Sequence, residues 1–89
     1  MPRVSAFYGI VILMFVDEDR HRGRPHFHAE YAGAAASFDI ETLETIAGRL
    51  PRRATRLVVK WAEIHQSELR ANWRRARARQ PLIPIEPLR

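Results

Sequence analysis

Cysteine is absent from the 89-residue sequence, so the chain can form neither a disulfide bond nor a thiolate metal site. Long hydrophobic runs are also absent, because the apolar segment at residues 8–16 is too short to span a bilayer. No small-residue cleavage site follows this segment, so it lacks the pattern of a signal peptide. These absences predict a cytoplasmic protein that does not engage a membrane.

The motifs of several enzyme classes are missing as well. The sequence has four glycines and contains no glycine-rich phosphate loop, no dinucleotide fingerprint and no serine or cysteine nucleophile constellation. It has no internal repeats and no low-complexity linker, and its length suits one small fold. Residues 1–89 are therefore expected to form a single domain.

Charge is distributed unevenly along the chain. Residues 1–48 contain four basic and seven acidic residues, for a net charge of −3. Residues 49–79 contain ten basic and two acidic residues, for a net charge of +8. This polarity fits self-association of an acidic half with a basic half, or the binding of nucleic acid or an acidic protein by the basic half.

The first half of the chain has the pattern of an antiparallel β-meander over about residues 7–47. An uninterrupted apolar strand is predicted at 8–16, followed by a charged loop at 17–25. Further strands are predicted at 26–31 and 35–40, joined by a turn at Ala32-Gly33, and 45–47 fits a fourth strand. The sheet is therefore expected to have three or four strands.

The second half has the pattern of one long amphipathic helix, at about residues 52–79. Pro51 suits the first turn of a helix and Pro81 ends it, while apolar residues recur near the 3.6-residue period, with a break possible near Gln66. Trp61 and Trp73 lie on the apolar side and are expected to be core or interface anchors and not base-stacking platforms. The proline-rich tail, residues 80–89, is expected to be extended and to cover the second sheet face or a neighbouring subunit. The fold class is thus α+β.

Chemistry is concentrated in the segment at residues 25–31. Successive strand residues point to opposite faces, so His26, His28 and Glu30 share one face, spaced about 7 Å apart along it. Two imidazoles and a carboxylate could perform acid-base catalysis, as in a metal-independent ribonuclease. Alternatively, His26 and His28 with His21 could bind a divalent metal such as zinc. The same residues could also be surface histidines, and nothing in the sequence requires a cofactor.

The helix carries a second candidate site on its polar side. Five basic residues recur there at helical spacing and are predicted to contact nucleic acid: Arg49, Arg52, Arg53, Arg56 and Lys60. An amphipathic helix also needs polar residues on its solvent face, and arginine is a good helix former, so the stripe also fits a plain solvated surface.

Several motifs together resemble a known family. They are Phe7-Tyr8-Gly9-Ile10-Val11-Ile12, Pro25-His26-Phe27-His28-Ala29-Glu30-Tyr31, Leu50-Pro51-Arg52-Arg53-Ala54, Val59-Lys60-Trp61-Ala62, Asn72-Trp73 and Ile85-Glu86-Pro87-Leu88. They resemble domain of unknown function family 4160, a group of small bacterial and phage-associated proteins. In that family a second proline often precedes the Pro-His-Phe-His-Ala block, where this chain has Arg24. Members are often encoded beside another small protein, which implies a toxin–antitoxin-like or regulatory pair.

The sequence thus predicts a small basic interaction protein. Its expected partners are a second copy of itself, a cognate small protein, and RNA. The alternative is a small hydrolase that uses His26 and His28, either without a metal or through a bound divalent ion.

Overall fold

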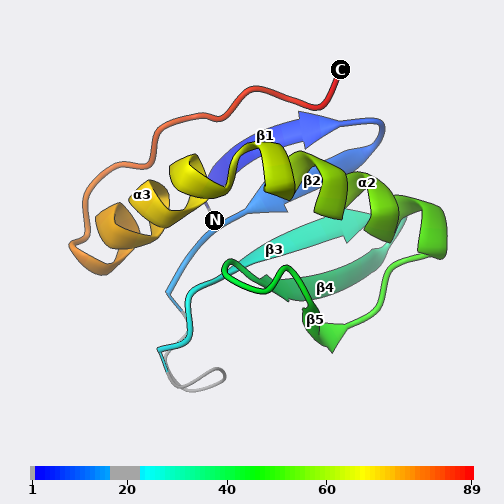
Figure 1. Cartoon of the computed structure of the whole chain (residues 1–89), viewed down its shortest axis with the longest axis horizontal. Helices are drawn as coiled ribbons and strands as arrows, with labels where there is room; N and C mark the ends of the chain where they lie inside the picture. Colours follow the sequence, from blue (N-terminus) through cyan, green and yellow to red (C-terminus); the bar gives the residue numbers. More distant parts are fainter. Residues whose placement is uncertain (1, 17–22) are drawn as a thin grey trace.

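The fold is α+β, as predicted, with two helices packed on one face of an antiparallel sheet (Figure 1). The computed structural model describes residues 2–16 and 23–89. Within them the sheet has five strands in sequential order: β1 (Arg3–Phe7), β2 (Ile10–Leu13), β3 (His26–Tyr31), β4 (Ala34–Asp39) and β5 (Thr45–Gly48). The helices are α2 (Arg52–Ile64) and α3 (Gln66–Arg77). No helix among these residues is both long enough and apolar enough to cross a bilayer.

The prediction of a single strand at residues 8–16 is wrong. The chain forms a hairpin there, in which β1 pairs with β2 and Phe7 is opposite Ile10. Tyr8 and Gly9 connect them with φ values of 48° and 79°. Positive φ at both central residues is the signature of a type I′ turn, which matches the twist of the flanking strands. Because β1 contains polar residues, the sequence pattern did not indicate a strand before residue 8.

The remaining strands agree with the sequence more closely. β3 has the predicted bounds, and Ala32 and Gly33 form a second turn with positive φ at both positions. The suggested fourth strand is present as β5, so the sheet gains its fifth strand from β1. Gly48 at the end of β5 has a φ of 71°, and a Cβ there would lie 2.3 Å from the carbonyl oxygen of Ala35. Only glycine fits this close approach of two strands.

The single long helix predicted at residues 52–79 is two helices. α2 ends at Ile64, and His65, with φ −111° and ψ 23°, separates it from α3. The suggested break near Gln66 is therefore confirmed, one residue earlier. Pro51 directly precedes α2, as expected for a residue that cannot donate a helix hydrogen bond.

The core lies between the helices and one face of the sheet. Phe27 and Phe38 are cross-strand partners whose ring centroids are 5.4 Å apart. The ring of Trp61 lies 6.0 Å from that of Phe27 and 5.4 Å from that of Phe7. Trp61 and Trp73 are both buried, which confirms them as core residues.

The tail is extended, as predicted, but it does not cover the second sheet face. It follows the outer edge of β1 and the helices of its own chain (Figure 1). The backbone N–H of Ile85 donates to the carbonyl oxygen of Val4 (2.8 Å), and the indole N–H of Trp61 donates to that of Glu86 (2.8 Å). These donors and acceptors lie at the β1 edge and on α2, and they fix the tail there.

Candidate functional site

Strand β3 brings His26 and His28 together. Their ring centroids are 5.0 Å apart and the rings are nearly perpendicular, at 76°. His26 is only 1% exposed, and its ring lies 5.0 Å from that of Trp73. Its Nδ1 is 2.6 Å from the carbonyl oxygen of Arg24, and because a carbonyl can only accept, Nδ1 carries the proton. His26 is therefore held in the interior.

His28 has a different environment. Its ring stacks on that of Phe15, with centroids 4.1 Å apart and an interplanar angle of 3°. Its Nδ1 lies 3.0 Å from the hydroxyl oxygen of Ser37, the cross-strand partner on β4. Glu30 is exposed farther along β3, opposite Val11 and Ala35. The structure thus brings the two imidazole rings into contact, whereas the carboxylate of Glu30 is exposed farther along the strand.

The described residues contain no metal-binding cluster. In residues 2–16 and 23–89, no group of three histidine, aspartate or glutamate side chains could hold a metal ion. His21, the third predicted ligand, lies outside this part of the chain. The metal-binding role of His26, His28 and His21 and the catalytic role of His26, His28 and Glu30 stay predictions. A reaction at His26 would also require that its buried side chain become accessible.

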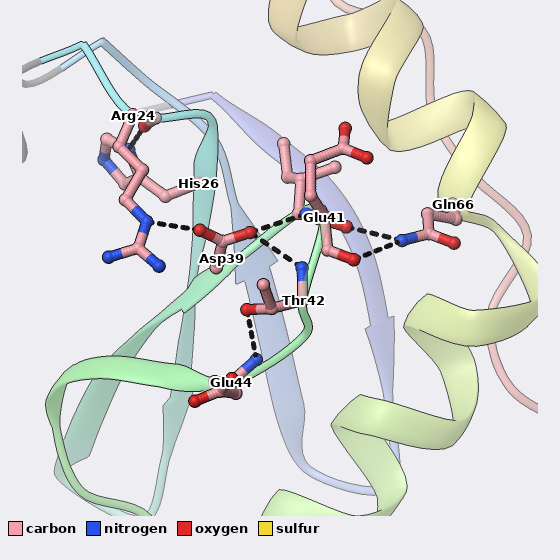
Figure 2. Close-up of polar contacts among 8 residues, drawn as sticks. Arg24, His26, Asp39, Glu41, Thr42, Glu44 and Gln66 are labelled. Atoms are coloured by element: carbon pink, nitrogen blue, oxygen red, sulfur yellow. Dashed lines mark hydrogen bonds and ion pairs between the residues drawn. The ribbon is translucent and has the colours of Figure 1, made fainter.

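A carboxylate next to His26 organises the loop between β4 and β5. Asp39, the cross-strand partner of His26, is ion-paired with the Nε of Arg24. Its Oδ1 accepts hydrogen bonds from the backbone N–H groups of Glu41 (2.6 Å) and Thr42 (2.8 Å) (Figure 2). Burial raises the pKa of Asp39, but the hydrogen bonds from Thr42, Arg24 and Glu41 outweigh it and hold the pKa below its ordinary value.

Helix α3 is tied to the same loop. The side-chain amide of Gln66 donates to the carbonyl oxygens of Ile40 (2.8 Å) and Glu41 (3.1 Å) (Figure 2). The guanidinium of Arg70 binds both carboxylate oxygens of Glu41, at 2.9 Å each for the closest contacts. This hydrogen bond lowers the pKa of Glu41 and raises that of Arg70. Arg70 is therefore paired with an acid of the β4–β5 loop.

The basic residues within α2 and directly before it lie exposed on the surface. We use the term basic α2 surface for Arg49, Arg52, Arg53, Arg56 and Lys60. All five are exposed, and none forms an ion pair with an acidic residue in the described part of the chain. A hollow of about 860 Å³ lies against the start of α2, lined by Arg49, Arg52 and Arg56 together with uncharged neighbours. The helical spacing had predicted the five positions, but only the structure separates them from paired arginines such as Arg70.

A second hollow beside this surface was not predicted. It measures about 230 Å³ and is lined by Tyr8, Tyr31, Arg53, Ala54 and Leu57, which we call the tyrosine pocket. Its walls come from the β1–β2 turn, the end of β3 and the first turns of α2. These three segments lie at the same end of the molecule (Figure 1). The sequence contained one indication of this pocket. If Tyr8-Gly9 had been recognised as a turn, an aromatic side chain would have been expected at the tip of a hairpin.

These features define a small α+β protein with a buried and a half-buried histidine side by side and an exposed basic helical surface. The chain belongs to the family described as Domain of unknown function (DUF4160), whose family model matches residues 9–74. This match confirms the resemblance seen in the sequence. No curated protein and no solved structure matches the chain.

Proposed function

We propose that this protein is a small interaction module that binds RNA through the basic α2 surface, as a member of a toxin–antitoxin-like or regulatory pair. The observation that carries the proposal is the contrast among its basic residues. Arg24 and Arg70 are paired with acids of the sheet and its loops, whereas the five residues of the basic α2 surface have no acidic partner among the described residues. Exposed arginines at the end of α3 also lack such a partner, but the basic α2 surface borders a hollow lined by Arg49, Arg52 and Arg56.

RNA carries a negative charge on each of its phosphates. Basic side chains that neutralise RNA phosphates release condensed counterions, and this release supplies most of the sequence-independent affinity. Several exposed charges on one helix face, with a hollow along its first turns, suit a flexible phosphate chain. The pairing with a second small protein rests on the family resemblance, and such a partner would meet the same surface with acidic residues.

The hydrolase alternative has less support. Metal-independent cleavage of RNA needs an imidazole within hydrogen-bond reach of a ribose hydroxyl. His26 instead packs on Trp73 and donates its Nδ1 proton to the backbone of Arg24. Its neighbour His28 is half-buried under Phe15.

The salt dependence of RNA binding tests the proposal. The affinity of a labelled single-stranded RNA is measured by fluorescence anisotropy across a range of salt concentrations. A triple substitution, Arg52→Gln, Arg56→Gln and Lys60→Gln, removes three phosphate contacts. The slope of log affinity against log salt should become shallower by about two, because each contact on a single strand contributes about 0.7.

A charge-matched variant provides the control. Arg74, Arg77 and Arg79 are exposed basic residues at the far end of α3. Their replacement by glutamine lowers the net charge equally and should leave the slope nearer to that of the wild-type protein. Equal slopes for both triple variants would remove the basic α2 surface as the RNA site, and no binding by the wild-type protein at low salt would reject RNA as the ligand.

A further inference from the structure

We propose that the tyrosine pocket receives one unstacked base of a single-stranded RNA whose phosphates lie on the basic α2 surface. This inference rests on the proposed function and narrows it, because it specifies single-stranded RNA as the ligand. The site combines two aromatic side chains, an aliphatic floor and one guanidinium group within a single small hollow.

Tyr8 is exposed in the β1–β2 turn. Its side chain is 59% exposed, although a tyrosine ring normally buries most of its apolar surface. Its backbone is in the left-handed region, with φ 48°, where a bulky residue is uncommon and costs free energy. Glycine follows directly, so the turn itself does not need an aromatic residue at this position. An exposed ring held at such a turn is suited to contact with a ligand.

The walls of the tyrosine pocket are aromatic and apolar apart from Arg53. Tyr31 is half-buried and packs against the core, and its ring lies close to Gly9, where an added Cβ would be 3.5 Å from its Cε1. Ala54 is buried and Leu57 half-buried, so together they provide an apolar floor. Nucleobases stack on aromatic rings through their π faces, whatever the base, and each stacked base contributes substantial affinity. The aromatic and apolar walls therefore suit the flat face of a base.

Arg53 connects the tyrosine pocket with the basic α2 surface. This residue belongs to the basic α2 surface and also lines the pocket. Its guanidinium can stack on a base or bind the adjoining phosphate. Arg52 and Arg56 line the other hollow on the same first turns of α2. A single strand crossing α2 could therefore place its phosphates on the arginines and one base between the tyrosines. Paired and stacked bases of a duplex could not enter.

Substitution of Tyr8 tests this arrangement directly. Tyr8→Ala should weaken the binding of a single-stranded RNA by about 5- to 150-fold, the loss of one aromatic stacking partner. The salt slope should not change, because no phosphate contact is removed. Tyr8→Phe retains the ring and should bind like the wild-type protein. A strand containing 2-aminopurine should show quenched fluorescence on binding the wild-type protein and lose this quenching with Tyr8→Ala.

Two controls make the result decisive. Ile64 is an apolar residue of α2 that is 63% exposed and does not line the pocket, so Ile64→Ala should leave RNA affinity unchanged. Duplex RNA of the same sequence should bind wild-type protein and Tyr8→Ala equally. If Tyr8→Ala binds single strands as tightly as the wild-type protein, or loses duplex binding to the same degree, the base pocket is wrong while the phosphate surface stands. If the wild-type protein binds no RNA, both proposals fail.

Discussion

At the scale of single residues, Asp39 shows how a buried charge can organise a loop. Its carboxylate receives one guanidinium and two backbone N–H groups, from Glu41 and Thr42. Hydrogen bonds of this kind stabilise the ionised form and offset the cost of removing it from water. The same loop is then bound by Gln66 of α3, so a local turn is linked to the helical layer.

The lowered pKa of Asp39 predicts a pH dependence of stability. Since the folded-state pKa lies below the unfolded value of 3.8, the contribution is fully present above that value and is lost as pH falls through the folded-state pKa. Asp39→Asn should lower the free energy of unfolding at pH 7 by about 1–3 kcal/mol. The difference from the wild-type protein should shrink on acidification below pH 3.8. Urea unfolding at a series of pH values measures both quantities.

An exposed carboxylate on the same loop gives the control for this pH effect. Glu44→Gln should change the free energy of unfolding by less than about 0.5 kcal/mol, because no hydrogen bond to its side chain is formed in the described part of the chain. A difference between Asp39→Asn and wild-type protein that stays constant from neutral to acidic pH would contradict the account.

Residues of the candidate site were predictable where the sequence pattern is local. The exposed basic residues within α2 follow from helical spacing, whereas Arg49 precedes the helix. The shared location of His26 and His28 follows from strand alternation. The burial of His26 by Trp73 was not predictable, because it depends on how α3 crosses the sheet. The tyrosine pocket was equally hidden, since Tyr8, Tyr31 and Arg53 are brought together only by the folded sheet and helix.

At the scale of elements, the quality of the prediction depended on the turn residues. β3 and the start of α2 were placed correctly, because Gly33 and Pro51 mark their boundaries in an ordinary way. The first hairpin was missed because Tyr8 is an unusual residue for a position with positive φ. The separation of α2 from α3 at His65 involves neither glycine nor proline, so no strong helix-breaking residue marks it.

The end of α3 allows a stabilising substitution. Arg79 has a φ of 58°, the N–H of Gln80 bonds the carbonyl of Arg75 (2.8 Å), and that of Arg79 bonds the carbonyl of Ala76 (3.1 Å). This is a Schellman motif, in which the left-handed position normally contains glycine. Arg79→Gly should raise the free energy of unfolding by about 0.5–1 kcal/mol, because relief of the left-handed strain exceeds the added entropy of the unfolded chain. Thermal or urea unfolding gives the value.

A glycine within the helical part of α3 separates the effect of the left-handed position from the loss of an arginine charge. Arg74 lies within α3 and is also exposed, so Arg74→Gly removes the same charge but introduces glycine into helical backbone. It should lower the free energy of unfolding by about 0.5–1 kcal/mol. Two changes of the same sign would show that charge, and not the helix end, determines the result.

At the scale of the whole molecule, the tail completes the fold of its own chain. The side chain of Asn72 binds both backbone groups of Ile83: its Nδ2 donates to the carbonyl oxygen (2.8 Å) and its Oδ1 accepts from the N–H (2.9 Å). Leu82 and Leu88 pack partly against the core. A small domain buries little surface, so a tail that closes one edge of the sheet and accepts the hydrogen bond of the Trp61 indole matters to its stability.

Two isoleucines of the tail, two positions apart, test this role. Ile85 is 4% exposed, whereas Ile83 is 53% exposed. Ile85→Ala should lower the free energy of unfolding by about 2–5 kcal/mol, the usual cost of a large-to-small change in a core. Ile83→Ala should cost less than about 0.5 kcal/mol, because the clamp by Asn72 uses only the backbone of that residue. Since the contacts lie within one chain, the effect of Ile85→Ala on the midpoint of thermal unfolding should not depend on protein concentration. A midpoint that falls on dilution, together with a smaller mass in light scattering, would mean that the tail packs on a second subunit instead.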